Sequence, residues 1–87
     1  MAKYKTTICW VKDIHTDLSI DKLQHDVAAC LKELKVNVTA VGDFIQSTVV
    51  IDANNYNHAR LLAGDLAEEV SDNVGGIVPV YSGFVSK

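Results

Sequence analysis

The residues that carry most enzyme chemistry are few in this chain, and they are spread along it. The 87 residues include three histidines and two cysteines, which are His15, His25, His58, Cys9 and Cys30. Their spacings match no Cys-x-x-Cys, His-Glu-x-x-His, serine-hydrolase or phosphate-loop motif. A catalytic thiol needs an adjacent base and an electropositive setting, whereas both cysteines lie in apolar patterns. We therefore expect a non-enzymatic protein with no catalytic, cofactor-binding or metal-binding residue.

One short string is similar to a known functional motif. His58-Ala59-Arg60 resembles the His-Ala-Arg string at a helix start in the phosphocarrier proteins of sugar-uptake systems, which implies phosphotransfer. The chain departs from that pattern, because Leu61 stands where the family has proline. The string also follows the third expected strand rather than the first. We prefer the structural interpretation, in which these residues form the first turn of a helix.

Composition and charge narrow the class of partner. The apolar share of 48% and the charged share of 22% are typical of a globular chain, expected here as a single domain over residues 1–87. Net charge is −3 and uneven, with a sum of +1 in residues 1–35 and −4 in residues 36–87. This distribution argues against nucleic acid and permits a basic partner. No apolar run approaches the roughly 18 residues of a membrane span, so we expect a cytoplasmic protein that binds no membrane.

The chain is organised around a hairpin in residues 36–53, where runs rich in valine, isoleucine and threonine flank a segment that opens with Gly42-Asp43. β-Branched residues favour strands, and glycine beside aspartate is typical of turns. Helical periodicity precedes and follows this hairpin, and a further strand lies beyond each helix. We predict strands near 4–12, 36–42, 47–53 and 77–81, and helices near 19–35 and 55–74.

The element order predicts an α+β fold. The order β-α-β-β-α-β with right-handed crossovers gives a ferredoxin-like arrangement, a four-stranded antiparallel sheet with both helices on one face. The first and third strands are then central, and the second and fourth are edges. Pro79 agrees with an edge position for the last strand, since proline cannot donate a ladder hydrogen bond.

The first strand predicts a self-association surface. Its apolar residues fall on both faces, with Ile8 and Trp10 on one and Cys9 and Val11 on the other. If Trp10 points away from the helices, it forms an exposed apolar patch together with Ile8, Val41 and Val50. The alternative places Trp10 in the core beneath the helices, and the sequence leaves both open. The first orientation predicts a homodimer, or a larger homo-oligomer, that forms through the open sheet face.

The second helix predicts a surface for another protein. At 100° per residue, Leu61 falls opposite the core stripe, among acidic residues with no base between them. A leucine inside a charged rim resembles the anchor of an interface, although a solvated helix face is the simpler alternative. The predicted partner-binding residues are Leu61, Asp65, Glu68, Glu69 and Asp72.

These surfaces favour a small acidic interaction or regulatory module that self-associates and binds a basic protein surface. The alternative is a small-molecule sensor resembling ACT-type regulatory domains, in which two domains hold an effector at their interface. Fold alone does not choose between them.

Overall fold

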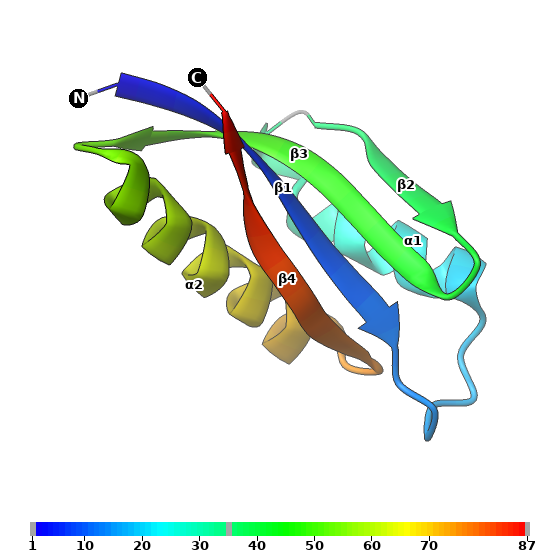
Figure 1. The fold of residues 1–87 in the computed structure, drawn as a ribbon. Coiled ribbons are helices and arrows are strands. Elements are labelled where there is room, and N and C mark those ends of the chain that lie inside the picture. Colours follow the sequence, from blue (N-terminus) through cyan, green and yellow to red (C-terminus); the bar gives the residue numbers. More distant parts are fainter. Residues whose placement is uncertain (1, 35, 87) are drawn as a thin grey trace.

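The chain forms one four-stranded sheet and two α-helices (Figure 1). The computed structural model describes residues 2–34 and 36–86, and for 81–86 only the backbone. The elements are β1 (Ala2–Lys12), α1 (Ile20–Cys30), the short 3-10 helix η1 (Lys32–Leu34), β2 (Val38–Val41), β3 (Phe44–Ala53), α2 (Tyr56–Val74) and β4 (Ile77–Ser86).

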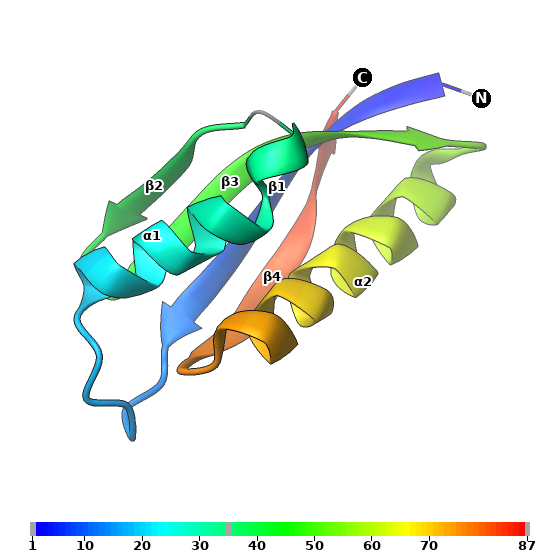
Figure 2. The ribbon, with the colours of Figure 1, turned by 180° about the vertical axis from the view of Figure 1, so that it is seen from behind.

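The sheet is antiparallel and has the strand order β2-β3-β1-β4. The predicted α+β fold, the central first and third strands and the edge position of the last strand are confirmed. Both helices pack on the same face of the sheet, and the opposite face has no covering layer (Figures 1 and 2). The pairing of β1 with β4 contains register shifts near Cys9, so this strand pair is irregular there.

The hairpin turn is tighter than the sequence interpretation placed it. Gly42 has a φ of +60°, which glycine adopts without steric cost, and only Gly42 and Asp43 separate β2 from β3. Val41 therefore pairs directly with Phe44, and β3 begins three residues before the predicted residue 47. This change brings Phe44 into the sheet.

The helix boundaries follow local capping groups. The Ser19 hydroxyl accepts a hydrogen bond from the Lys22 N–H at 3.2 Å and starts α1. Asn55 Oδ1 accepts from the His58 N–H at 2.8 Å and starts α2. The first helix ends at Cys30 instead of 35, because the chain tightens into η1 once Leu31 is buried.

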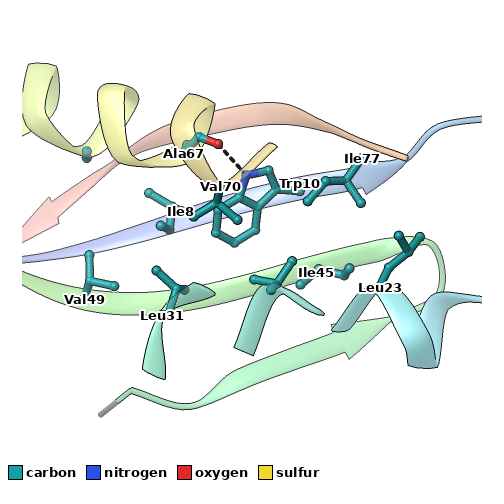
Figure 3. Packing of buried hydrophobic residues seen from close by; sticks show 11 residues of the cluster. Ile8, Trp10, Leu23, Leu31, Ile45, Val49, Ala67, Val70 and Ile77 are labelled. Atoms are coloured by element: carbon teal, nitrogen blue, oxygen red, sulfur yellow. Dashed lines mark hydrogen bonds between the residues drawn. The ribbon is translucent and has the colours of Figure 1, made fainter. Parts of the chain in front are cut away.

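The core lies between the sheet and the helices, with Trp10 near its centre (Figure 3). The Trp10 side chain has no exposed surface, and its indole Nε1–H donates to the backbone oxygen of Ala67 at 2.9 Å. Small residues on the buried side of α2 leave room for this ring between helix and sheet. Ala63 and Ala67 of α2 lie in the same core cluster as Trp10, whereas Ala59 packs in a second cluster with Tyr4.

The two sheet edges differ. The strand β2 is four residues long, and the Gln24 side-chain amide of α1 donates to the Val38 carbonyl at 2.8 Å. That contact occupies a backbone acceptor of the edge strand. The other edge, β4, is ten residues long and contains Pro79.

Candidate interaction surfaces

The open sheet face does not contain two of the predicted self-association residues. Ile8 and Trp10 are fully buried beneath the helices, so they cannot contribute to an exposed patch. Strand alternation predicted the two sets correctly, but the helix-facing set of β1 is the Ile8/Trp10 set. The expectation that these two residues lie on the open face is therefore wrong. Val41 and Val50, the other two, are exposed there, at 69% and 52%.

The apolar patch that the open face does carry is a row across all four strands at its hairpin end. Val41 pairs with Phe44, Phe44 pairs with Val11, and Val11 pairs with Val78. Phe44 is 48% exposed and Val78 is 47% exposed. These four neighbouring side chains, Val41, Phe44, Val11 and Val78, are defined here as the apolar row. Cross-strand neighbours on one face are within contact distance, so the row is one continuous patch.

On β1, β2 and β3, the described side chains in the middle of the open face are mostly polar and uncharged. A shallow depression of about 540 Å³ lies there, next to the apolar row. The hydroxyls of Thr7 and Thr48 form a hydrogen bond of 3.1 Å across its floor. The residues that line it are Thr7, Asn37, Thr39, Gln46 and Thr48. They offer both donors and acceptors without a formal charge.

Among the described side chains, the charged groups on the open face lie at the end farthest from the hairpin. Alternation puts Lys3 and Lys5 of β1 and Asp52 of β3 on this face. Lys3 Nζ lies 3.3 Å from Asp52 Oδ1 in an exposed ion pair. In contrast, α1, η1 and α2 carry seven of the eleven acidic residues of the chain. The open face is therefore nearly neutral, and the helix layer is acidic.

The predicted acidic surface of α2 is exposed in the structure. Leu61 is 68% exposed, and its acidic neighbours, Asp65, Glu68, Glu69 and Asp72, all lie on the solvent side of the helix. Within the described part of the chain, no base forms an ion pair with any of these four carboxylates. The helix thus brings together the residues that the sequence placed on one face.

The histidines and cysteines do not converge. His58 Nδ1 accepts a hydrogen bond from the Asn54 N–H at 3.1 Å, so this imidazole completes the helix start instead of facing a partner side chain. Cys9 and Cys30 are free thiols, and burial raises the pKa of the Cys9 thiol. Among residues 2–34 and 36–86, no three histidine, cysteine or acidic side chains are placed to hold one metal ion.

Phe44 and Val78 are the surface residues that the sequence interpretation missed. Phe44 was assigned to the turn, because the turn was predicted to extend to Gln46. A two-residue Gly-Asp turn is the signal that would have found it, since such a turn pairs the residues on either side. Val78 lies in the predicted last strand. The sequence interpretation used its neighbour Pro79 to place that strand at an edge and did not assign Val78 to a face of the sheet.

Comparison of the chain with known protein families, with curated proteins and with solved structures found no match. Within the described residues, no helix is both long enough and apolar enough to cross a bilayer.

Proposed function

We propose that this protein is a non-enzymatic interaction module that forms a homodimer through its open sheet face. The observation that carries the proposal is the apolar row, which crosses all four strands on a face without a covering layer. A row of this kind is self-complementary, as a two-fold symmetric contact requires. The charge distribution also favours a second copy, since stacked open faces hold the two acidic helix layers apart.

The size of the open face indicates a weak dimer. At about 3.4 Å per residue and about 4.8 Å between strands, the four strands present about 570 Å² of sheet. Two stacked faces bury about 1,100 Å², slightly below the range of about 1,200–2,000 Å² for stable interfaces. We therefore expect a dissociation constant on the order of micromolar.

Sedimentation velocity over a concentration series tests self-association. The wild-type chain should shift from monomer to dimer, and Phe44→Lys should remain monomeric with an unchanged circular dichroism spectrum. Leu61→Lys is the matched control, because it adds the same charge to an exposed apolar position in the helix layer. A wild-type chain that stays monomeric at several hundred micromolar (about a hundredfold above a micromolar dissociation constant) would refute the dimer. A series of oligomers larger than the dimer would instead indicate head-to-tail contacts.

The acidic surface of α2 supports binding of a basic protein segment. Like charges three and four residues apart cost about 0.2–0.5 kcal/mol per pair, so this arrangement does not serve helix stability. Asp72 also lies in the last turn, where the helix dipole disfavours a carboxylate. A lysine-rich partner that places an apolar side chain on Leu61 would relieve both penalties.

Titration with a synthetic lysine-rich peptide that carries a central apolar pair tests this second contact. Glu68→Lys with Asp72→Lys should slow association and reduce its salt dependence, while Leu61→Ala should mainly speed dissociation. The control is Asp21→Lys with Glu33→Lys, which makes the same charge change on the other helix segments. Equal binding by all variants would leave the α2 surface as a solvated face.

The polar depression favours one alternative, an ACT-like sensor that holds an effector between two copies. Its uncharged lining would suit a small ligand with amide or hydroxyl groups. A thermal-shift screen with uncharged metabolites distinguishes the two functions, because a ligand of the folded dimer raises the melting temperature.

The proposal includes two finer assignments. We place the domain in the ferredoxin-like class, which the two central strands β1 and β3 and the single helix layer support. We also propose a cytoplasmic location, because Cys9 and Cys30 are both free thiols, as is usual in a reducing compartment.

A further inference from the structure

We infer that the second copy stacks on the open face about a two-fold axis that runs parallel to the strands, between β1 and β3. This inference rests on the proposed dimer and gives its geometry. It places β1 of each copy over β3 of the other, and it places the apolar row of each copy over the same row of the other.

Only two principal arrangements stack one sheet face on its own copy by a two-fold rotation. Stacked faces point toward each other, so the axis must lie in the plane between the sheets. An axis parallel to the strands keeps every cross-strand row at its own level. An axis perpendicular to the strands reverses the order of the rows, so that the hairpin end of one copy covers the opposite end of the other.

The apolar row favours the parallel axis. In that arrangement Val11 lies over Phe44 of the second copy, and Val41 lies over Val78 of the second copy. Apolar groups then cover apolar groups over the whole width of the sheet. Below them, Thr7 lies over Thr48 of the second copy, so polar side chains of the two central strands meet.

The charges exclude full overlap about the perpendicular axis. Reversal of the rows about Thr7 would place Lys3 over Val11 and Asp52 over Phe44 of the second copy. Each Lys3–Asp52 pair would then lose water without gaining a further charged neighbour, which is costly. The parallel axis instead places Lys3 over Asp52 of the second copy. Together with the 3.3 Å pair within each copy, Lys3 and Asp52 then form four charges of alternating sign at this end of the interface, and Lys5 lies one row farther in, over Val50 of the second copy.

Cross-linking of single-cysteine variants distinguishes the two axes. The background carries Cys9→Ser and Cys30→Ser, and the probes are Val11→Cys and Val50→Cys, which lie three rows apart on the open face. If the axis is parallel to the strands, each probe lies about 11 Å from the same residue of the second copy near the centre of the interface. The distance is slightly larger away from the centre, because packed sheets cross at about 30°. An axis perpendicular to the strands can lie at the level of only one probe. The other probe is then about 40 Å from its own copy, measured along the strands.

A short bismaleimide is the suitable reagent, because disulfides need Cα atoms closer than about 7 Å. We expect both probes to give covalent dimers at concentrations where sedimentation detects a dimer. A chain that retains only Cys30, on α1, should give none. Cross-linking of only one probe, or of neither, in a chain that still dimerises would overturn the parallel axis and leave the proposed dimer standing. Absence of a dimer in the wild-type chain would refute both.

Charge exchange provides an independent test. Lys3→Asp should weaken the dimer, because it places two aspartates against each other, and Lys3→Asp with Asp52→Lys should restore it. The monomer should tolerate both changes, since an ion pair this exposed contributes little to folding. Equal dissociation constants for the single and double variants would contradict the stacked position of these charges.

Discussion

The buried hydroxyl of Thr6 leads to the prediction that its replacement stabilises the protein. Its side chain is fully buried on the helix-facing side of β1, and its hydroxyl has no hydrogen-bond partner among the described residues. An unpaired buried hydroxyl costs about 1–3 kcal/mol, because it has lost its hydrogen bonds to water. Valine has almost the same shape and no polar atom. We therefore expect Thr6→Val to raise the free energy of unfolding.

The expected gain is about 1–2 kcal/mol, the lower part of that range, because the new methyl group must fit the space of the hydroxyl. For a domain of this size, each kcal/mol raises the melting temperature by about 4–8 °C. Urea unfolding followed by circular dichroism measures the change. The chain is kept dilute, so that self-association does not contribute to the stability.

Ser47 is the matched control. It is also a buried hydroxyl on the helix-facing side of a central strand, but it donates to the Asn37 carbonyl at 2.9 Å. Ser47→Ala should therefore destabilise the chain by about 1 kcal/mol. Thr6→Val is expected to raise the free energy of unfolding, and Ser47→Ala is expected to lower it. If Thr6→Val lowers stability as Ser47→Ala does, the Thr6 hydroxyl has a partner and the reasoning fails.

Three further predictions concern folding and thiol chemistry. Trp10→Phe should lower the unfolding free energy by about 2–3 kcal/mol, because it removes a hydrogen bond and leaves a cavity. Val78→Ala, at an exposed position, is the control, and an equal urea midpoint for the two variants would contradict the buried position of Trp10. Gly76→Ala should destabilise more than Gly42→Ala in urea unfolding, since both have positive φ but only Gly76 has a side-chain atom 3.0 Å from an added Cβ; equal losses would refute the crowding. The raised pKa of Cys9 means that the native chain holds this proton to higher pH than the unfolded chain does. Stability should therefore fall as pH rises from the unfolded pKa to the folded pKa. Iodoacetamide mapping should show alkylation of Cys9 at higher pH than in the urea-unfolded chain, and coincident profiles would contradict the shift.

The order of the elements could be predicted because each has a strong local signal. The Ser19 cap and the spacing of Leu23 and Val27 define the first helix without reference to the rest of the chain. The ends of the helices and strands were harder to predict from the sequence, because they depend on tertiary contacts. The first helix ends early since Leu31 enters the core, and β4 extends to Ser86 since β1 offers a pairing partner along most of its length.

The open face could be predicted only in part, for a geometric reason. Alternation separates Ile8 and Trp10 from Cys9 and Val11, but it does not say which set the helices cover. That choice depends on the space beneath α2, where small side chains admit the indole of Trp10. The acidic surface around Leu61 was predictable because it follows from the periodicity of one helix.

The contact between Gln24 and Val38 has a consequence for growth of the sheet. Strands add to a sheet only where backbone groups are unpaired. At β2 the edge is four residues long, and one of its carbonyls is already occupied by the helix beside it. Further strands therefore join more readily on the β4 side, although Pro79 offers no N–H there. When that side has paired with β4 of another molecule, both outer edges of the enlarged sheet are β2 strands, each four residues long and with one carbonyl already occupied. Addition along the hydrogen-bonding direction is thus disfavoured beyond two molecules.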